Sequence, residues 1–147
     1  MKITFIAHSA FLVEWDKFYT LFDYVYEPDY TGTLPPLDPQ KPLLVFSSHS
    51  HEDHFDGKVF GLLEQYPLTQ FFVSRDTRLT ERRRKWLGIS DEAFARTTVL
   101  RPDSILLTEA AGEELSVRAI KSTDIGNAYL LRAEGKMVYH GGDLNWW

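Results

Sequence analysis

The strongest constraint on the fold of this chain is an apolar run that leads directly into a cluster of histidines. Residues 42–46 read PLLVF, a continuous apolar segment that is typical of a strand covered on both faces of a sheet. The chain then continues as SSHSHEDHF, so that three of its five histidines fall within residues 49–54. A buried strand followed at once by so many coordinating side chains predicts a functional site where the strand ends.

Short strands dominate the rest of the sequence. Apolar, β-branched and aromatic residues at 2–6, 10–15 and 18–23 predict an antiparallel meander at the start of the chain. Further strands are expected at residues 69–74, 97–100, 104–107, 115–120, 127–133 and 136–140, with Glu134 and Gly135 as a tight reversal before the last of them.

Helices and one long loop separate some of these strands. Three helices are expected, over residues 57–66, over residues 75–88 with Ser74 as the N-cap, and over residues 91–95 after Ser90. Residues 26–42 contain five prolines and predict a long surface loop of the kind that often borders a site. The pattern as a whole indicates an α/β protein, rich in strands, whose sheets carry helices on their outer faces.

Length and composition narrow the class of protein. A chain of 147 residues is long enough to form one compact domain with its own core. Its net charge of -5 argues against a general nucleic-acid binder, because such proteins neutralise phosphates with basic residues. The chain has no cysteine, so imidazole and carboxylate groups are the ligands left for any metal.

The sequence shows no targeting segment. Its first ten residues, MKITFIAHSA, contain an apolar run too short for the core of a signal peptide. No stretch approaches the length of a membrane span. A cytoplasmic protein without a membrane partner is therefore expected.

The histidine cluster has the composition of a catalytic metal site. His49, His51 and Asp53 occupy alternate positions, so an extended backbone would turn them to one side, and His54 follows from the next position. Two metal sites become feasible in this way. Zinc accepts imidazole and carboxylate ligands, and a catalytic zinc keeps one position for water, which then ionises near a pH of about 7. A second metal about 3.5–4 Å away would clamp the attacking and the polarised oxygen. The cluster therefore predicts hydrolytic chemistry.

Two motifs resemble a known family. HSHEDH is similar to the H-x-H-x-D-H signature of the metallo-β-lactamase-fold hydrolases, and MVYHGGD resembles the later strand that ends in their metal-bridging aspartate. The resemblance covers residues 1–147 and implies an αββα sandwich, present here as its N-terminal portion: the first sheet, its helices and the start of the second sheet. HSAFLVEW and LFDY resemble the lactonase-like branch, relatives of L-ascorbate-6-phosphate lactonase.

The resemblance also implies roles for particular residues. His49 and His51 would bind the first metal, Asp53 and His54 the second, and Asp143 would bridge them. Histidine at position 51, where diiron redox members of the family carry glutamate, favours zinc and hydrolysis. Zinc is thus the expected cofactor, as one or two ions, with manganese and iron as alternatives. Asp53 would also act in catalysis by steering the proton of the attacking water.

The sequence departs from the family pattern in two places. The family's third histidine is missing from KSTDIGNAY, where Asp124, or Ser122 through a water, could replace it, or where the Asp and Gly residues could simply form a turn. The family's last histidine would lie well beyond Asp143. We therefore expect residues 1–147 to be a single domain that is incomplete at its C-terminus, or one that completes itself by self-association. Trp146 and Trp147 favour the first alternative, because tryptophan is better buried than exposed.

Three further residues are candidates for the same site. His8 follows the first strand and could touch substrate or orient a ligand, or be an ordinary residue at a strand end. His140 could support the metal site, or the alternation of its strand could turn it away. Asp23 ends the third strand and could hydrogen-bond a metal-binding histidine.

The function predicted from these observations is a zinc-dependent hydrolase that directs a metal-bound hydroxide at an ester, lactone or phosphoester bond of a small molecule. One alternative is a degenerate metal-binding or structural module without a full ligand set. Another is a nucleic-acid phosphodiesterase that uses Arg78, Arg82 and Lys85 on one helical face. A solvated helix face explains these three residues more simply, given the acidic composition.

Overall fold

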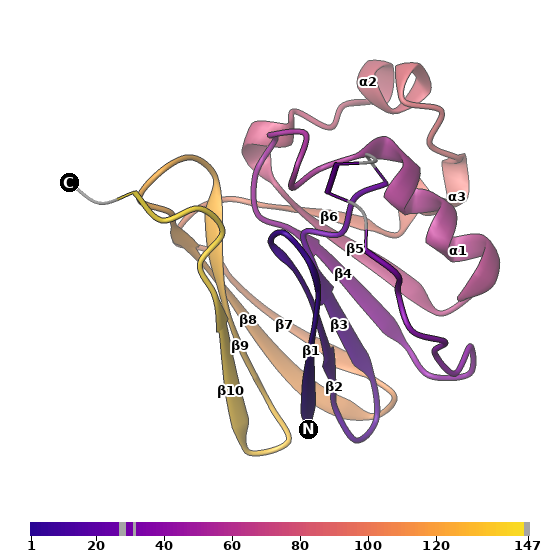
Figure 1. Ribbon diagram of the computed structural model, residues 1–147, viewed down its shortest axis with the longest axis vertical. Helices are drawn as coiled ribbons and strands as arrows, with labels where there is room; N and C mark the ends of the chain where they lie inside the picture. Colours follow the sequence, from indigo (N-terminus) through magenta and orange to yellow (C-terminus); the bar gives the residue numbers. More distant parts are fainter. Residues whose placement is uncertain (27–28, 31, 146–147) are drawn as a thin grey trace.

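Two sheets form the framework of the part of the chain that the computed structural model describes, which is residues 1–26, 29–30 and 32–145. They lie face to face in Figure 1. The first sheet has the strand order β1 (Lys2–Ala7), β2 (Ala10–Glu14), β3 (Tyr19–Phe22), β4 (Leu43–Ser47), β5 (Thr69–Ser74) and β6 (Thr97–Leu100). The second sheet has the order β10 (Lys136–His140), β9 (Asn127–Ala133), β8 (Glu113–Lys121) and β7 (Ile105–Ala110).

The first sheet changes from antiparallel to parallel pairing at its centre. β1, β2 and β3 are antiparallel neighbours, which confirms the predicted meander. β3, β4, β5 and β6 pair in parallel, so that their carboxyl ends meet at one edge of the sheet. All five residues of β4 are buried, as its apolar run predicts for a strand covered on both faces.

The first predicted helix is divided into two short segments, and the third forms over the predicted residues. The expected helix over 57–66 is a 3-10 turn, η1 (Gly57–Gly61), followed by α1 (Leu62–Gln65). α3 (Asp91–Ala95) begins as predicted, because the Ser90 hydroxyl accepts a hydrogen bond from the Ala93 amide.

The prediction of one helix over residues 75–88 is wrong. The segment divides into η2 (Arg75–Thr77) and α2 (Glu81–Trp86), separated at Arg78, whose φ is 49°. The reversal at Arg78 lets Leu79 turn into the core, and Thr80, not Ser74, caps α2 through a 3.2 Å hydrogen bond from the Arg83 amide. Arg78 therefore does not share a helical face with Arg82 and Lys85, which removes the geometric basis of the nucleic-acid interface.

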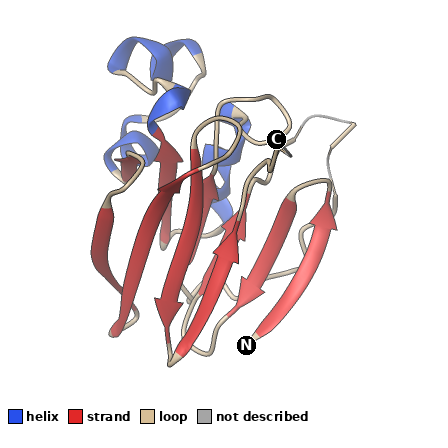
Figure 2. Cartoon of the chain, turned by 90° about the vertical axis from the view of Figure 1, so that its left-hand side faces the viewer, coloured by secondary structure: helices blue, strands red, loops and turns tan. Residues whose placement is uncertain are grey.

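The core lies on both faces of the first sheet. One cluster packs helical residues such as Val59, Phe60 and Leu62 against one face, and Figure 1 shows the helices on that side only. The other cluster packs residues such as Phe46 and Tyr129 between the two sheets. Figure 1 shows the resulting layers, with the first sheet between the helices and the second sheet, and Figure 2 views the molecule from the side of the second sheet.

The second sheet is a series of hairpins. Glu134 and Gly135, with φ of 51° and 68°, make the predicted reversal between β9 and β10. β7 and β8 extend beyond their predicted ends and meet at a second reversal, at Ala111 and Gly112, which was not predicted. Ile105, on β7, is 65% exposed, so apolar surface of this sheet is open to solvent in the described part of the chain.

Some predictions fall on or next to residues outside the described ranges. The long loop predicted over 26–42 contains no helix or strand among its described residues, but residues 27–28 and 31 lie outside them. Trp146 and Trp147 also lie outside, and the prediction that a further portion or a second copy covers the open sheet stays a prediction. Within the described ranges, no helix has the length and apolar character needed to cross a membrane.

Candidate metal centre

The candidate site lies where several strands end. Asp23 follows β3 and the histidine cluster follows β4, and these two strands are parallel neighbours whose carboxyl ends meet at one edge. The second sheet adds the turn after β8, which carries Asp124, and the segment after β10, which carries Asp143. Residues that are far apart in the sequence therefore meet at one end of the sandwich.

The histidine cluster itself is a turn and not an extended segment. The amides of His54 and Phe55 both donate hydrogen bonds to the His51 carbonyl oxygen, over 3.0 and 2.8 Å. The prediction that His49, His51 and Asp53 face one side of an extended backbone is therefore wrong. The turn instead divides the side chains between two neighbouring groups.

The first group consists of His49, His51, Asp124 and Asp143. Each contributes one nitrogen or oxygen, and these atoms all lie within 4.8 Å of one another. The Nε2 atom of His49 is 3.0 Å from Nδ1 of His51 and 3.6 Å from Oδ2 of Asp143. Of the alternatives for the missing histidine, Asp124 joins the group, whereas the Ser122 hydroxyl donates a 2.8 Å hydrogen bond to the Asp143 carbonyl.

The second group consists of His8, Asp53 and His54, again with ligand atoms within 4.8 Å of one another. Oδ2 of Asp53 is 3.5 Å from Nε2 of His54 and 3.6 Å from Nε2 of His8. His8 sits in the reversal between β1 and β2, with φ of 48°, and reaches the site from the first hairpin. The sequence placed His8 only near the site, and the structure places it among the coordinating atoms.

Asp143 lies between the two groups. Its Oδ1 atom is 3.1 Å from Nε2 of His54, and its Oδ2 atom is 3.6 Å from Nε2 of His49. The rings of His49 and His54 are 3.9 Å apart at their centroids. One carboxylate thus presents an oxygen to each group, which is the arrangement that a bridging ligand needs.

A buried hydrogen-bond network holds the histidines from behind. Asp23 is 1% exposed and accepts bonds from the Ser48 amide (2.7 Å), the Ser48 hydroxyl (2.7 Å), Nδ1 of His54 (2.8 Å) and Nε2 of His140 (2.7 Å). Asp23 therefore contacts a candidate ligand as the sequence suggested. His140 is not turned away from the site, because it donates to the same carboxylate.

The network determines which nitrogens remain free. An ionised Asp23 can only accept, so the Ser48 hydroxyl and Nδ1 of His54 must donate to it. The Ser48 oxygen then accepts from Nδ1 of His49, 2.9 Å away. The Nε2 atoms of His49 and His54 are left as acceptors that face the candidate site.

These nitrogens fit a metal ion. Nε2 of His54 is buried and makes no hydrogen bond to any described residue. Carboxylate oxygens of Asp143 and Asp53 lie 3.1 and 3.5 Å from it, so in the tautomer described above three acceptors face one another, and a metal ion would satisfy them together. Imidazole nitrogens and carboxylate oxygens are also the donors that zinc takes in proteins without cysteine ligands.

The electrostatics of the network act differently on the two buried histidines, favouring the neutral form of His49 and the protonated form of His54 while no metal is bound. Burial alone would raise the pKa of Asp23, but charge attraction and hydrogen bonds from His140 and His54 outweigh it and hold that pKa below its usual range. Burial alone would lower the pKa of His54, yet its bond to Asp23 and the nearby carboxylates raise it. Burial and repulsion from His54 lower the pKa of His49, which favours the neutral imidazole that a metal requires.

Two glycines allow the second sheet to approach the histidines. Gly126 has φ of 75°, and a Cβ atom there would lie 2.3 Å from the Ser48 carbonyl oxygen and 2.6 Å from Cβ of His49. The Asn127 amide donates a 2.8 Å hydrogen bond to the same carbonyl. Gly142 has φ of 60°, and a Cβ atom there would lie 3.0 Å from Cβ and Oγ of Ser48. Close backbone packing thus brings Asp124 and Asp143 to the site.

Sequence reasoning missed two supporting residues, Ser48 and Asp76. Ser48 connects Asp23 to His49, as described above. Asp76 follows β5, and its Oδ2 atom accepts a 2.8 Å hydrogen bond from the Ser50 amide, which holds the histidine loop from its other side. The position of Asp76 after a strand parallel to β4 was the available signal, because parallel strands end at a common edge.

Comparison with known proteins gives a consistent result. A sequence profile described as a beta-lactamase superfamily domain matches residues 2–146. A protein from Opitutus terrae named a UPF0173 metal-dependent hydrolase is 29% identical over 153 residues, covering 97% of this chain and 63% of that protein. The chain therefore spans less than two thirds of the length of this relative.

Solved structures share the fold. Igni18, described as a novel metallo hydrolase from Ignicoccus hospitalis, matches with a TM-score of 0.64 at 21% identity, covering 99% of this chain and 61% of that one. A B3 metallo-β-lactamase with an active-site glutamic acid matches with a TM-score of 0.52 at 15% identity, covering 92% and 56%. At these identities the likeness shows the fold alone, and it confirms the fold class predicted from the motifs.

Proposed function

Because this chain belongs to the beta-lactamase superfamily, we propose that it is a zinc-dependent hydrolase acting on an ester, lactone or phosphoester bond of a small molecule. One observation carries the proposal, namely that the carboxylate of Asp143 lies between two groups of imidazole and carboxylate donors. The relative named a metal-dependent hydrolase supports the same chemistry.

The donor atoms suggest how zinc would be held. His49, His51 and Asp124 would bind one ion, a second set would bind another, and Asp143 would contact both. The second set is His8, Asp53 and His54. When bound, such ions lower the pKa of a coordinated water to about 7 and polarise a carbonyl or phosphoryl oxygen.

The chain's own side chains would orient the reaction. Asp53 is partly exposed, and its Oδ2 atom lies between the imidazoles of His8 and His54, where it can accept a proton from an attacking water. Asp23 keeps His54 in one tautomer, with Nε2 free for the site. The His8 side chain is 41% exposed to solvent, so it can also contact substrate.

Metal analysis of the purified protein tests the proposal. We expect up to two zinc ions per chain, and we expect the His49→Ala/His51→Ala variant to lose at least one of them. Glu52→Gln is a matched control, because Glu52 is an exposed acid in the same loop that joins neither group. Unchanged zinc in the double variant would overturn the site assignment.

An activity assay separates hydrolysis from metal binding alone. We expect the zinc-loaded protein to cleave nitrophenyl esters, a simple lactone or a nitrophenyl phosphodiester, and the double histidine variant to be inactive on the same compounds. Zinc bound without cleavage of any of these bonds would favour the alternative of a degenerate metal-binding module.

A further inference from the structure

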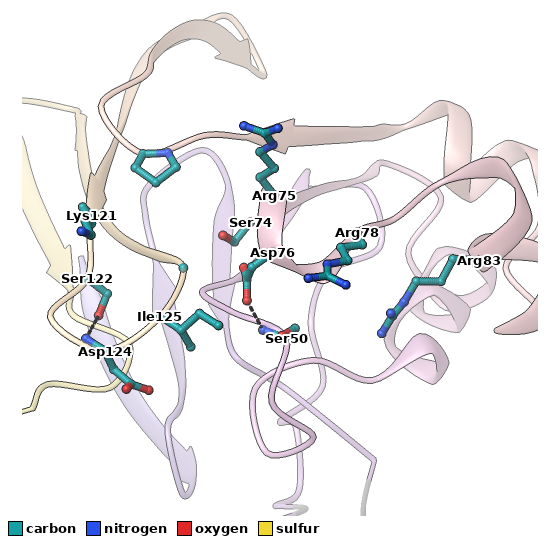
Figure 3. Close-up of a pocket in the computed structure, with 12 residues that line it drawn as sticks. Ser50, Ser74, Arg75, Asp76, Arg78, Arg83, Lys121, Ser122, Asp124 and Ile125 are labelled. Atoms are coloured by element: carbon teal, nitrogen blue, oxygen red, sulfur yellow. Dashed lines mark hydrogen bonds between the residues drawn. The ribbon is translucent and has the colours of Figure 1, made fainter.

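We propose that a cavity beside the candidate metal centre binds an anionic group of the substrate, a phosphate or a carboxylate. The inference rests on the proposed function and narrows it, because it assigns the substrate a negatively charged end. The cavity has a volume of about 730 Å³, which is within the range of small-molecule sites. Figure 3 shows the residues around it.

Basic side chains surround this cavity. Arg75 and Arg78 come from the segment after β5, Arg83 comes from α2, and Lys121 ends β8. In Figure 3 the three arginines line one side and Lys121 lies on the other. Two carboxylates, those of Asp76 and Asp124, are the acidic groups in the lining, so four cations face two anions.

Most of these cations are available to a ligand. Arg75, Arg78 and Lys121 are exposed and form no ion pair with any residue of the described ranges. Elsewhere in the chain, Arg84 and Arg96 pair with neighbouring carboxylates. Cations held close together in excess over the carboxylates of the same cavity attract an anion, since each gains a charge-assisted hydrogen bond.

Buried donors add a second, independent observation. Nε of Arg83 and the hydroxyl of Ser74 are buried, and neither makes a hydrogen bond within the part of the chain that is described. Ser74 is fully buried and lines the cavity, as does Arg83. The buried Oδ1 atom of Asp76, in the same lining, is an acceptor that likewise makes no hydrogen bond within the described ranges. Phosphate and carboxylate oxygens would accept from the two donors, and a protonated phosphate oxygen can also donate to Asp76.

The cavity adjoins the candidate metal centre. Asp124 lines the cavity and also belongs to the group of His49 and His51. Ser50, between these two histidines, lines it as well, and its amide is fixed by Asp76. A small molecule with its charged end among the arginines can therefore place a reactive bond at the first metal group.

A small anion suits this site better than a nucleic acid. The four cations line one cavity of about 730 Å³, the size of a small-molecule site, and the net charge of -5 disfavours binding of a long polyanion. The side chain of Ile125, also in the lining, can pack against the carbon skeleton of the substrate.

Calorimetric titration tests anion binding without any reaction. Inorganic phosphate and, separately, acetate are titrated into protein treated with a chelator, so that neither anion can bind through a metal. We expect binding that weakens about ten-fold in Arg78→Gln and again in Arg78→Gln/Lys121→Gln, because each change removes one charge-assisted contact. Arg118→Gln is the matched control, since Arg118 is exposed on β8 and does not line the cavity. Comparison of the affinities for phosphate and acetate shows which of the two oxyanions the cavity prefers.

A pair of matched esters connects the cavity to activity. With zinc-loaded protein, we expect an ester carrying a remote phosphate or carboxylate to have a KM about ten-fold or more below that of its neutral analogue. In Arg78→Gln/Lys121→Gln this preference should disappear, while kcat/KM for the neutral ester stays unchanged.

The outcomes distinguish the two proposals. Cleavage of the neutral and charged esters with equal efficiency, together with no anion binding, would overturn the cavity proposal and leave the hydrolase intact. Anion binding without any cleavage would overturn the proposed hydrolase. Tight binding of a single-stranded oligonucleotide through the same arginines, with none of phosphate or acetate, would assign the cavity to nucleic acid instead. Far-ultraviolet circular dichroism of each variant checks that the substitutions leave the secondary structure unchanged.

Discussion

The two groups of candidate ligands differ in how firmly the fold holds their side chains in place. His54 is fully buried, and Asp23 and Ser48 hold it through a closed network of short hydrogen bonds. In the other group His49 is buried on the same network, but two members, His51 and Asp124, are exposed side chains on separate turns. The His54 group has one exposed member, His8. Folding therefore preorganises more of the His54 group, and the His49 group depends more on the positions of two surface turns.

The difference has chemical consequences. In the His54 group, a ligand is presented in one tautomer and one orientation before any metal arrives. In the His49 group, an exposed carboxylate must be ordered as the metal binds, which costs side-chain entropy. Changes to the buried network should accordingly reduce stability, and changes to the exposed group should reduce metal affinity.

Removal of the buried acid should have the largest effect. Asp23→Ala leaves two histidines and the Ser48 hydroxyl without their shared acceptor, so we expect a loss of about 3–5 kcal/mol in the free energy of unfolding. Urea denaturation followed by tryptophan fluorescence measures it. Asp16→Ala, at an exposed acid, should change stability by no more than about 0.5 kcal/mol. Equal losses in both variants would mean that the network adds nothing.

A substitution at the contact between the two sheets should have the next largest effect on stability. In Gly126→Ala, the new methyl group meets the Ser48 carbonyl oxygen and the residue keeps a positive φ, so we expect a loss of about 3 kcal/mol. Gly135→Ala also keeps a positive φ but has open space around it, and it should lose only about 1 kcal/mol. Thermal unfolding compares the two. A tolerated Gly126→Ala would show that the approach of the second sheet is not tight.

Loss of the shared carboxylate should affect both groups. We expect Asp143→Ala to weaken zinc binding about 100-fold at both sites, because its two oxygens face His49 and His54 separately. Asp124→Ala should weaken only the first site. Competition with a coloured chelator resolves the two affinities. An Asp143→Ala variant that lost only one ion would show that the carboxylate does not bridge.

The pH dependence of metal binding should differ between the groups. The raised pKa of His54 means that its imidazole takes up a proton as pH falls, and a protonated imidazole binds no metal. The lowered pKa of His49 keeps that imidazole neutral to more acidic conditions. Between about pH 8 and pH 6, zinc affinity should therefore fall more at the His54 group than at the His49 group. Parallel losses at both sites would contradict this assignment.

Local patterns predicted much of the fold. The apolar run before the histidines became a fully buried strand, and the Glu134-Gly135 reversal formed where turn chemistry placed it. Both features have a signal within a few consecutive residues, an apolar run and a Gly-containing turn, so the sequence alone predicts them well. The single helix predicted over 75–88 failed, because burial of Leu79 and capping by Thr80 competed with continuous helix formation.

The roles of individual site residues were harder to predict. For His140, strand alternation left two orientations open, and the choice depended on the position of Asp23, more than a hundred residues away in the sequence. His8 gave no local signal that it would join Asp53, because that contact arises from the packing of the first hairpin beside the histidine loop. Asp76 was missed for the same reason.

The sequence by itself determined the chemistry available to this protein: a histidine and carboxylate cluster at the end of a buried strand, without cysteine. Only the tertiary structure decided how those groups are divided, because the turn at residues 51–54 and the close approach of Gly126 bring together side chains from both sheets. Metal coordination depends on distances of a few ångströms between ligand atoms. Packing between the layers sets those distances, and the order of residues along the chain does not.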